Sequence, residues 1–188
     1  HLDLSHNQLS EFELQPTESL ETLFLQGNNI ADISHLEGFT NLKVLYLDGN
    51  PISDFSPLKT LYRNLSDRDF SSPPFAENVK INGKKTVGST LTGSYTYTNL
   101  NDYAESDSTY KWLRSNTKNG QYSAITGATD ITYKLTDADL DKYIKFEVTP
   151  KADGEPSAGL PVSSQPFGPI TKSGSGGGIP PGGGGIPS

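Results

Sequence analysis

The sequence has no cysteine and no methionine, and it contains only one tryptophan and three histidines in 188 residues. Without cysteine the chain forms no disulfide, no thiolate metal site and no cysteine nucleophile. Long apolar runs are also missing, because no stretch approaches the roughly 18 consecutive apolar residues of a membrane-spanning helix. These absences predict a chain without thiol chemistry and without membrane insertion.

Basic residues are scarce in the first part of the chain. Residues 1–70 hold eleven acidic and four basic residues, which accounts for the whole net charge of -7, whereas residues 71–188 hold eleven of each. Nucleic acids are bound by clusters of lysine and arginine that release counterions from the phosphates. The sequence has no such cluster, so we predict no nucleic-acid partner.

Histidine is equally sparse, at His1, His6 and His35 only. Catalysis and metal binding need convergent groups on a rigid frame, and these three are spread along the first part of the chain. We therefore predict no catalytic residue, no metal and no cofactor. The chain is expected to be non-enzymatic.

What the sequence does contain is a repeat of 21 to 22 residues, marked by an asparagine at one fixed offset. The three copies are Leu2-x-Leu4-x-x-Asn7-x-Leu9, Leu20-x-x-Leu23-x-Leu25-x-x-Asn28-x-Ile30 and Leu42-x-x-Leu45-x-Leu47-x-x-Asn50-x-Ile52. Alternating leucines place one face of each short strand in a solenoid core. Each asparagine amide can bond the backbone that the following turn exposes, so we predict a stacked ladder of Asn7, Asn28 and Asn50.

Residues between the leucines point outward, onto the concave face of such a solenoid. We predict that this face binds a ligand, because aromatic side chains beside acidic ones suit a protein contact. The alternative is that these side chains only pack against each other across neighbouring strands. The predicted binding residues are Asp3, Ser5, Thr22, Phe24, Gln26, Val44, Tyr46 and Asp48.

The sequence pattern of the repeats resembles the leucine-rich repeats of bacterial internalins and related surface proteins. Asn28-Asn29-Ile30-Ala31-Asp32-Ile33 is followed by Leu36, Asn41-Leu42 and Leu45, and Asn50-Pro51-Ile52-Ser53-Asp54-Phe55 repeats the pattern. The resemblance covers about residues 1–60, and the segment from Glu11 to Ser19 departs from it. It implies a leucine-rich-repeat solenoid on a bacterial cell surface or in a secreted protein.

After the stiff segment Ser71-Ser72-Pro73-Pro74 the pattern changes to short alternating runs separated by turn signals. About seven short strands in about 95 residues predict a β-sandwich. The predicted strands are 78–82, 90–97, 109–114, 122–125, 131–135, 143–149 and 160–164. We expect Trp112, Tyr143 and Phe146 in the core of this sandwich.

Residues 77–170 also resemble an immunoglobulin-like module of large secreted proteins from Gram-positive spore-formers. The matching parts include Val79-Lys80-Ile81-Asn82-Gly83, Tyr110-Lys111-Trp112-Leu113-Arg114 and Leu135-Thr136-Asp137-Ala138-Asp139. The resemblance implies a spacer or binding module of a surface protein. The predicted fold is therefore mixed and mostly β, a leucine-rich-repeat solenoid end joined to an all-β immunoglobulin-like sandwich.

Two acidic segments raise the question of calcium, because hard cations take several oxygen ligands. The first contains Asn101, Asp102, Glu105 and Asp107, and the second contains Asp137, Asp139 and Asp141. Neither has the spacing of an EF-hand loop. We favour a solvated loop for the first and a turn that starts the next strand for the second.

Both ends of the sequence predict a fragment of a longer protein. His1 lies inside a repeat motif, and residues 173–188 are almost entirely glycine, proline and serine, a composition too costly in entropy to order. We expect further domains in the parent chain, and the resemblance implies cell-wall-anchoring repeats among them. The predicted divisions are 1–70 for the repeats and their cap, 71–77 for a linker, 78–171 for the sandwich and 172–188 for a disordered linker.

The leading functional hypothesis is an extracellular adhesion region, in which the repeats bind a protein or glycan and the sandwich is a spacer. The first alternative is a set of accessory modules in a large secreted polysaccharide-degrading enzyme whose catalytic domain lies elsewhere. A structural stalk without a ligand is the third.

Overall fold

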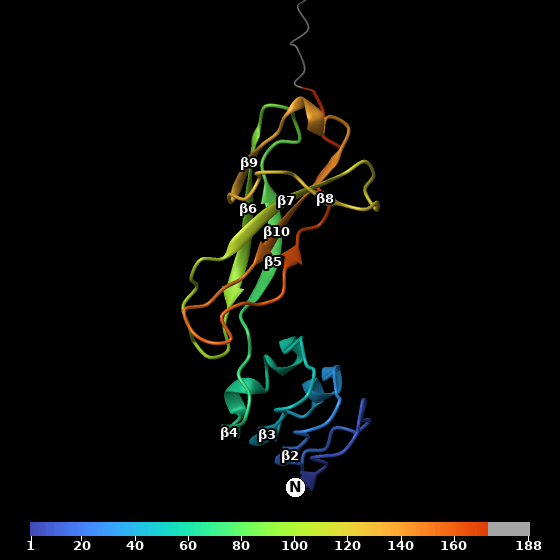
Figure 1. Ribbon diagram of the computed structural model, residues 1–188, viewed down its shortest axis with the longest axis vertical. Coiled ribbons are helices and arrows are strands. Elements are labelled where there is room, and N and C mark those ends of the chain that lie inside the picture. The colour runs from blue at the N-terminus through green and yellow to red at the C-terminus, as the bar shows by residue number, and fades with distance from the viewer. Residues whose placement is uncertain (173–188) are drawn as a thin grey trace, which may run out of the picture.

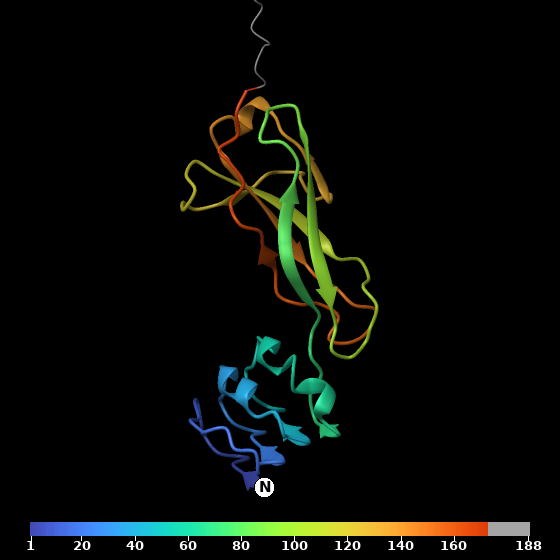
Figure 2. The same cartoon turned by 180° about the vertical axis from the view of Figure 1, so that it is seen from behind.

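The computed structural model describes residues 1–172, so the predicted disordered linker lies outside the described residues except for Lys172. Two domains follow one another along the long axis of the molecule (Figure 1). The repeats lie at the end that holds the N-terminus, and the sandwich occupies the rest. Seen from behind, the chain passes once from the repeats into the sandwich, just before its first long strand (Figure 2).

The repeats form one parallel sheet in the order β1-β2-β3-β4. Its strands are β1 (Leu2–Asp3), β2 (Thr22–Phe24), β3 (Val44–Tyr46) and β4 (Asp67–Arg68). Leu23 pairs in register with Leu45, and both side chains are fully buried. Alternation along each strand therefore directs the leucines into the core and their neighbours to the opposite face.

The opposite, convex side of the repeats contains short 3₁₀ turns. They are η1 (Ser34–Gly38), η2 (Ser56–Leu58) and η3 (Tyr62–Asn64). Between sheet and turns lies a single apolar cluster. Its buried members are Phe12, Leu23, Leu25, Ile30, Ile33, Leu36, Phe39, Leu42, Leu45, Leu47, Leu58, Leu61 and Leu65.

The C-terminal end of the predicted repeat region 1–70 adds a fourth parallel strand. β4 pairs with β3 through Val44 opposite Asp67 and Leu45 opposite Arg68. The guanidinium of Arg68 lies 4.2 Å from the centre of the Tyr62 ring, in the position where earlier repeats place a leucine. A stacked arginine thus ends the apolar row, because its planar group covers a ring while its charge reaches water.

All seven predicted strands of the sandwich are present, which confirms the mostly β fold. They are β5 (Phe75–Asn82), β6 (Thr90–Thr98), β7 (Thr109–Ser115), β8 (Ser123–Ala124), β9 (Thr132–Lys134), β10 (Tyr143–Thr149) and β11 (Val162–Ser163). One sheet has the order β5-β6-β9 and the other β11-β10-β7-β8. β5 begins at Phe75, inside the predicted linker, because Phe75 and Ala76 already pair with Thr98 and Tyr97 of β6.

The sandwich core is built around Trp112 and Phe146, which are fully buried with ring centres 5.1 Å apart. The indole Nε1 of Trp112 donates to the carbonyl of Asp130 at 2.9 Å, so its one polar group is satisfied. A Cβ atom on Gly93 would lie 2.4 Å from the Phe146 ring. Glycine at this position of β6 therefore lets the two sheets close over that ring.

Tyr143 is not part of the sandwich core, where the sequence places it. It is half-buried and lies outside the apolar cluster, whereas Ile144, Phe146 and Val148 of the same strand are buried. Successive side chains of a strand point to opposite faces, so a strand that buries its even-numbered residues turns Tyr143 away from the core.

The repeat core and the sandwich core are separate apolar clusters, and polar contacts join the two domains. The hydroxyl of Tyr62 in η3 donates to the side-chain oxygen of Asn101, in the loop between β6 and β7. The amide nitrogen of Asn101 in turn donates to the carbonyl of Ser72 at 2.8 Å. Arg63 and Asp102 form an exposed ion pair at 3.1 Å beside them.

A second group of contacts joins the domains around Lys59. Its ammonium group pairs with Glu77 on β5 and lies 4.8 Å from the centre of the Phe75 ring. The hydrogen bond from Lys59 lowers the pKa of Glu77. Nearby, a Cβ atom on Gly159 would lie 1.9 Å from the carbonyl oxygen of Pro74, so the β10–β11 loop touches the connecting segment. The orientation of the two domains is therefore fixed by contacts from several segments.

Candidate functional site

The concave face of the repeats is formed by the side chains of β1 to β4 that point away from the core. Strand register aligns Asp3 with Phe24 and Phe24 with Tyr46, which makes one row across the sheet. Thr22 and Val44 make a second row. Backbone hydrogen bonds continue the stacking beyond the strands and place Ser5, Gln26 and Asp48 in a third row. In these bonds the N–H groups of Leu4, His6, Leu25 and Gly27 donate to the carbonyls of Phe24, Gln26, Tyr46 and Asp48, in that order.

Aromatic rings occupy the middle row. The ring centres of Phe24 and Tyr46 lie 4.8 Å apart and the rings are tilted by 43°. His1 meets the other side of Phe24 edge-on, with ring centres 5.1 Å apart. Phe24 and Tyr46 are half-buried, because part of each ring packs against its neighbour and the rest is exposed to solvent.

Carboxylates border the aromatic row. The hydroxyl of Tyr46 donates to Asp67 at 2.8 Å, and this bond raises the pKa of Tyr46. At the other side, Asp3 accepts from the backbone and hydroxyl of Ser5 at 2.9 and 2.6 Å, which lowers the pKa of Asp3. Both carboxylates are thereby held in place by hydrogen bonds. The face combines aromatic surface with negative charge.

The third row contains a polar atom without a partner. The side-chain oxygen of Gln26 is buried and has no hydrogen-bond partner among residues 1–172. A buried acceptor without a donor carries a free-energy cost that a ligand donor would remove. Gln26 lies between Ser5 and Asp48, at the edge of the aromatic row.

Asp67 and Asp69 belong to the same surface but are missing from the sequence-based prediction. Asp67 holds Tyr46, and Asp69 accepts from the backbone N–H groups of Leu47 and Asp48 at 2.6 and 3.1 Å. Asp69 thus supplies the bonds that a further strand would otherwise give. The sequence signal for this part of the face is Leu65, which lies 23 residues after Leu42, close to the repeat length, and is buried like it.

The three asparagines stack along the repeats, next to the concave face. Asn28 donates to the carbonyls of Leu4 and Leu25 at 2.9 and 2.8 Å and accepts from Leu9 at 3.1 Å. Asn50 makes the equivalent bonds to Leu25, Leu47 and Ile30. Asn7 is exposed and bonds only within its own turn, to Leu4 and Ser5. Asn28 and Asn50 therefore link adjacent repeats, and the strands of the concave face keep a constant spacing.

Two family models match the chain. Residues 18–60 match the model described as Leucine Rich repeats (2 copies), and residues 76–164 match the AIR9 A9 domain, an immunoglobulin-like family. The chain is a leucine-rich-repeat region joined to an immunoglobulin-like domain. The comparison with curated proteins found no match.

Among solved structures, an internalin from Listeria monocytogenes is 35% identical over 29% of this chain, with a TM-score of 0.28. The match to the Leucine Rich repeats model confirms the predicted leucine-rich repeats. This chain covers 16% of that internalin, and so spans less than a fifth of its length. A fibronectin type III domain from the human KIAA0970 protein is 22% identical over 62% of this chain and 83% of its own length, with a TM-score of 0.27.

The two acidic segments are occupied by protein contacts. In the first, Asn101 and Asp102 bind the leucine-rich repeats, and Glu105 accepts from Tyr95 and Ser108. In the second, Asp139 is fully buried and binds residues of the immunoglobulin-like domain. Within residues 1–172 there is no group of three histidine, cysteine, aspartate or glutamate side chains that could hold a metal ion.

The histidines contact aromatic or turn residues instead of one another. His1 packs on Phe24, His35 lies 6.0 Å from the Phe12 ring, and His6 lies against the turn at Gly27. In the part of the chain that the structure describes, no helix has the length and apolar character of a membrane span. Leucine-rich repeats and immunoglobulin-like domains are typically non-catalytic, and the described side chains offer surfaces for binding.

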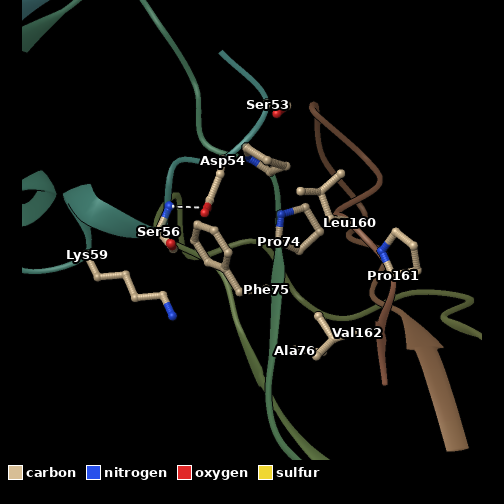
Figure 3. A pocket seen from close by; sticks show the side chains of 11 residues that line it. Ser53, Asp54, Ser56, Lys59, Pro74, Phe75, Ala76, Leu160, Pro161 and Val162 are labelled. Carbon is tan, nitrogen blue, oxygen red and sulfur yellow. Dashed lines mark hydrogen bonds between the residues drawn. The ribbon is translucent and has the colours of Figure 1, made fainter. Parts of the chain in front are cut away.

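A pocket of about 260 Å³ lies at the junction of the two domains (Figure 3). Its apolar wall comes from the connecting segment, β5 and the β10–β11 loop, and its polar wall comes from the last leucine-rich repeat. Asp54 accepts from the backbone of Ser56 at 2.8 Å on the polar side, and Leu160 is 53% exposed on the apolar side. The lining residues are Ser53, Asp54, Ser56, Lys59, Pro73, Pro74, Phe75, Ala76, Leu160, Pro161 and Val162.

Proposed function

We propose that this chain is a non-catalytic binding and spacer region of an extracellular bacterial surface protein, and that a protein ligand binds the concave face of its repeats. The observation that carries the proposal is the Phe24–Tyr46 pair at 4.8 Å, with Tyr46 held by Asp67. Aromatic residues dominate the energetic centres of protein interfaces, and rings that are already packed lose little freedom on binding.

The acids give this face a preferred chemistry. Asp3, Asp48 and Asp67 surround the rings, and all three are exposed. A lysine or arginine of a ligand can approach a ring face while it pairs with one of these carboxylates. A glycan is the second candidate, because a tilted aromatic pair also offers apolar surface to the face of a sugar ring.

The immunoglobulin-like domain serves as the spacer in this proposal, with the repeats at residues 1–70 and the sandwich at residues 78–171. The support is the joint around Lys59 and Asn101, which holds the repeats at one end of an elongated domain. The alternative parent is a large secreted polysaccharide-degrading enzyme. The full reading frame discriminates the two, because a glycoside hydrolase or lyase domain upstream would exclude an adhesin.

The test is binding of the full chain to a panel of purified extracellular proteins and to a glycan array. We expect a protein ligand whose affinity falls at least about tenfold in the double variant Phe24→Ala/Tyr46→Ala, because truncating a central aromatic costs roughly 2 kcal/mol or more. Tyr103→Ala is the matched control, since Tyr103 is an exposed aromatic residue of the sandwich (41% exposed). Equal binding by the double variant and the parent chain refutes the concave-face site, and binding to glycans alone transfers it to the second candidate.

A further inference from the structure

Strand β7 of the sandwich has one edge that is only partly covered. β10 pairs with it from Thr109 to Ser115, but β8 pairs with the other edge only at Leu113 and Arg114. Just before these, Trp112 donates to the carbonyl of Ala128 at 3.1 Å and accepts from Ile125 at 2.8 Å. Among residues 1–172 no strand pairs with that edge over Thr109–Lys111.

The backbone groups of Tyr110 face this uncovered edge. Strand residues direct their N–H and C=O groups alternately to one neighbour and to the other. Trp112 directs both of its groups to the β8 side, so Tyr110, two residues earlier, does the same. A donor and an acceptor therefore lie side by side without a partner strand. Another extended polypeptide backbone matches that arrangement.

The edge lines an open groove of about 680 Å³. Its lining residues are Ser108, Thr109, Tyr110, Lys111, Thr129, Asp130 and Ile131. The wall opposite β7 is the segment 129–131, which crosses from one sheet to the other. Ile131 is an apolar residue with 41% of its surface exposed there. The groove thus offers backbone groups on one side and an apolar contact on the other.

Both sides of the groove are held rigidly. The Trp112 indole binds the carbonyl of Asp130 at 2.9 Å, and the backbone N–H of Gly93 binds the carbonyl of Ile131 at 2.8 Å. The Tyr110 ring stacks on Phe146 with centres 5.6 Å apart, and its hydroxyl lies 3.0 Å from that of Tyr95. A site already in its bound shape loses little conformational entropy when it is filled.

We propose that this groove binds a short extended peptide segment of a partner protein, which pairs with Tyr110 as an added strand and places an apolar side chain on Ile131. The short length of the open edge selects this occupant. Among the described residues the open stretch spans Thr109–Lys111, which matches a short extended segment, whereas a stable contact between two folded copies needs a much larger interface. Lys111 and Asp130 give the groove both charges, so its preference is for backbone and shape over net charge.

The probe is an end-blocked pentapeptide of alternating threonine and valine, titrated to millimolar concentration into the ¹⁵N-labelled full chain. We expect saturable shifts of the Tyr110 and Ile131 amide signals. A second peptide carries N-methyl groups at the central residues, which removes their donors but keeps every side chain. It should bind at least roughly tenfold more weakly, because two backbone hydrogen bonds are lost.

Variants separate this groove from general apolar adhesion. Ile131→Lys should weaken binding severalfold, whereas Leu160→Lys, at another exposed apolar residue outside the groove, should leave it unchanged. Unaltered Trp112 fluorescence shows that each variant is folded. The proposal is overturned if the Tyr110 signal does not move, if the N-methylated peptide binds equally well, or if both lysine variants bind alike. It is also overturned if sedimentation shows a dimer whose formation shifts the Tyr110 signal without peptide.

Discussion

Replacing Asp139 by alanine tests how the turn before β10 is held. Its carboxylate is fully buried and accepts four hydrogen bonds. The Arg114 guanidinium and the Tyr133 hydroxyl each donate at 2.9 Å, and the backbone and hydroxyl of Thr136 donate at 2.8 and 3.0 Å. The bond from the Thr136 backbone is one half of the capping box of a 3₁₀ turn, η4 (Asp137–Asp139), and the Thr136 side chain accepts from the Asp139 backbone in the other half. Alanine leaves all of these donors without the partner they have in the folded domain.

The expected loss of stability is about 3 kcal/mol. Removing one partner of a buried ion pair costs roughly 3–5 kcal/mol, because the other charge stays behind uncompensated. The Arg114 side chain is 34% exposed and can turn toward water, which places the cost at the lower end of that range. Loss of a helix cap alone costs about 1 kcal/mol. For a domain of this size 3 kcal/mol corresponds to a fall in Tm of roughly 12 to 24 °C.

Trp112 makes the measurement selective, because it is the only tryptophan of the chain and lies in the sandwich core. Urea titration of the full chain, followed by its fluorescence, reports unfolding of the immunoglobulin-like domain alone. The control is Asp137→Ala on the same turn, where the side chain is exposed and the change should stay within about 0.5 kcal/mol. A loss below about 1 kcal/mol in Asp139→Ala, or equal losses in the two variants, would refute the reasoning.

Three further predictions follow from other contacts. Asn28→Ala should destabilise the repeats by about 3 kcal/mol, since three buried or partly buried hydrogen bonds worth roughly 1 kcal/mol each are lost. Asn7→Ala should cost under about 1 kcal/mol, because its bonds are exposed, and amide hydrogen exchange of the repeats measures both variants. Asn101→Ala removes two bonds across the joint and should broaden the distribution of distances between spin labels on the two domains, whereas Asp107→Ala should not. Burial, with the bond to Asp139, raises the pKa of Tyr133 to about 12 from its usual 10.0. The folded domain therefore holds this proton more tightly than the unfolded chain, so its stability should be complete below pH 10 and fall between pH 10 and about 12; Tyr133→Phe should reduce that slope in fluorescence-monitored unfolding.

The repeat domain was largely predictable because its information is local. Each leucine and asparagine recurs at a fixed offset, so strand register follows from the period, and the rows of the concave face follow from register. β4 escaped the pattern because Arg68 stands where the preceding strand has Leu45, and because Leu65 follows Leu42 by 23 residues, one more than the repeat length. The acids that border Tyr46 were missed for the same reason.

The sandwich shows a different limit. Alternation located its strands, and the same alternation at Ile144, Phe146 and Val148 shows why Tyr143 lies on the other face. The contacts between domains have no periodic signal at all. Tyr62 and Asn101 meet because two loops distant in sequence converge in space. The edge beside Tyr110 is uncovered because the segment that bonds to Trp112 turns away from β7 after Ala128.

The path of β5 bears on how this chain would carry mechanical tension. β5 enters the sandwich at the end near the repeats and runs along the long axis, while Thr171 pairs with Thr86 at the far end (Figure 1). A pull between the repeats and Lys172 would therefore be directed along β5. Its hydrogen bonds to β6 lie across that direction, so they would be sheared together and could not open one after another. A domain threaded in this way resists extension far better than one whose terminal strand peels from an end.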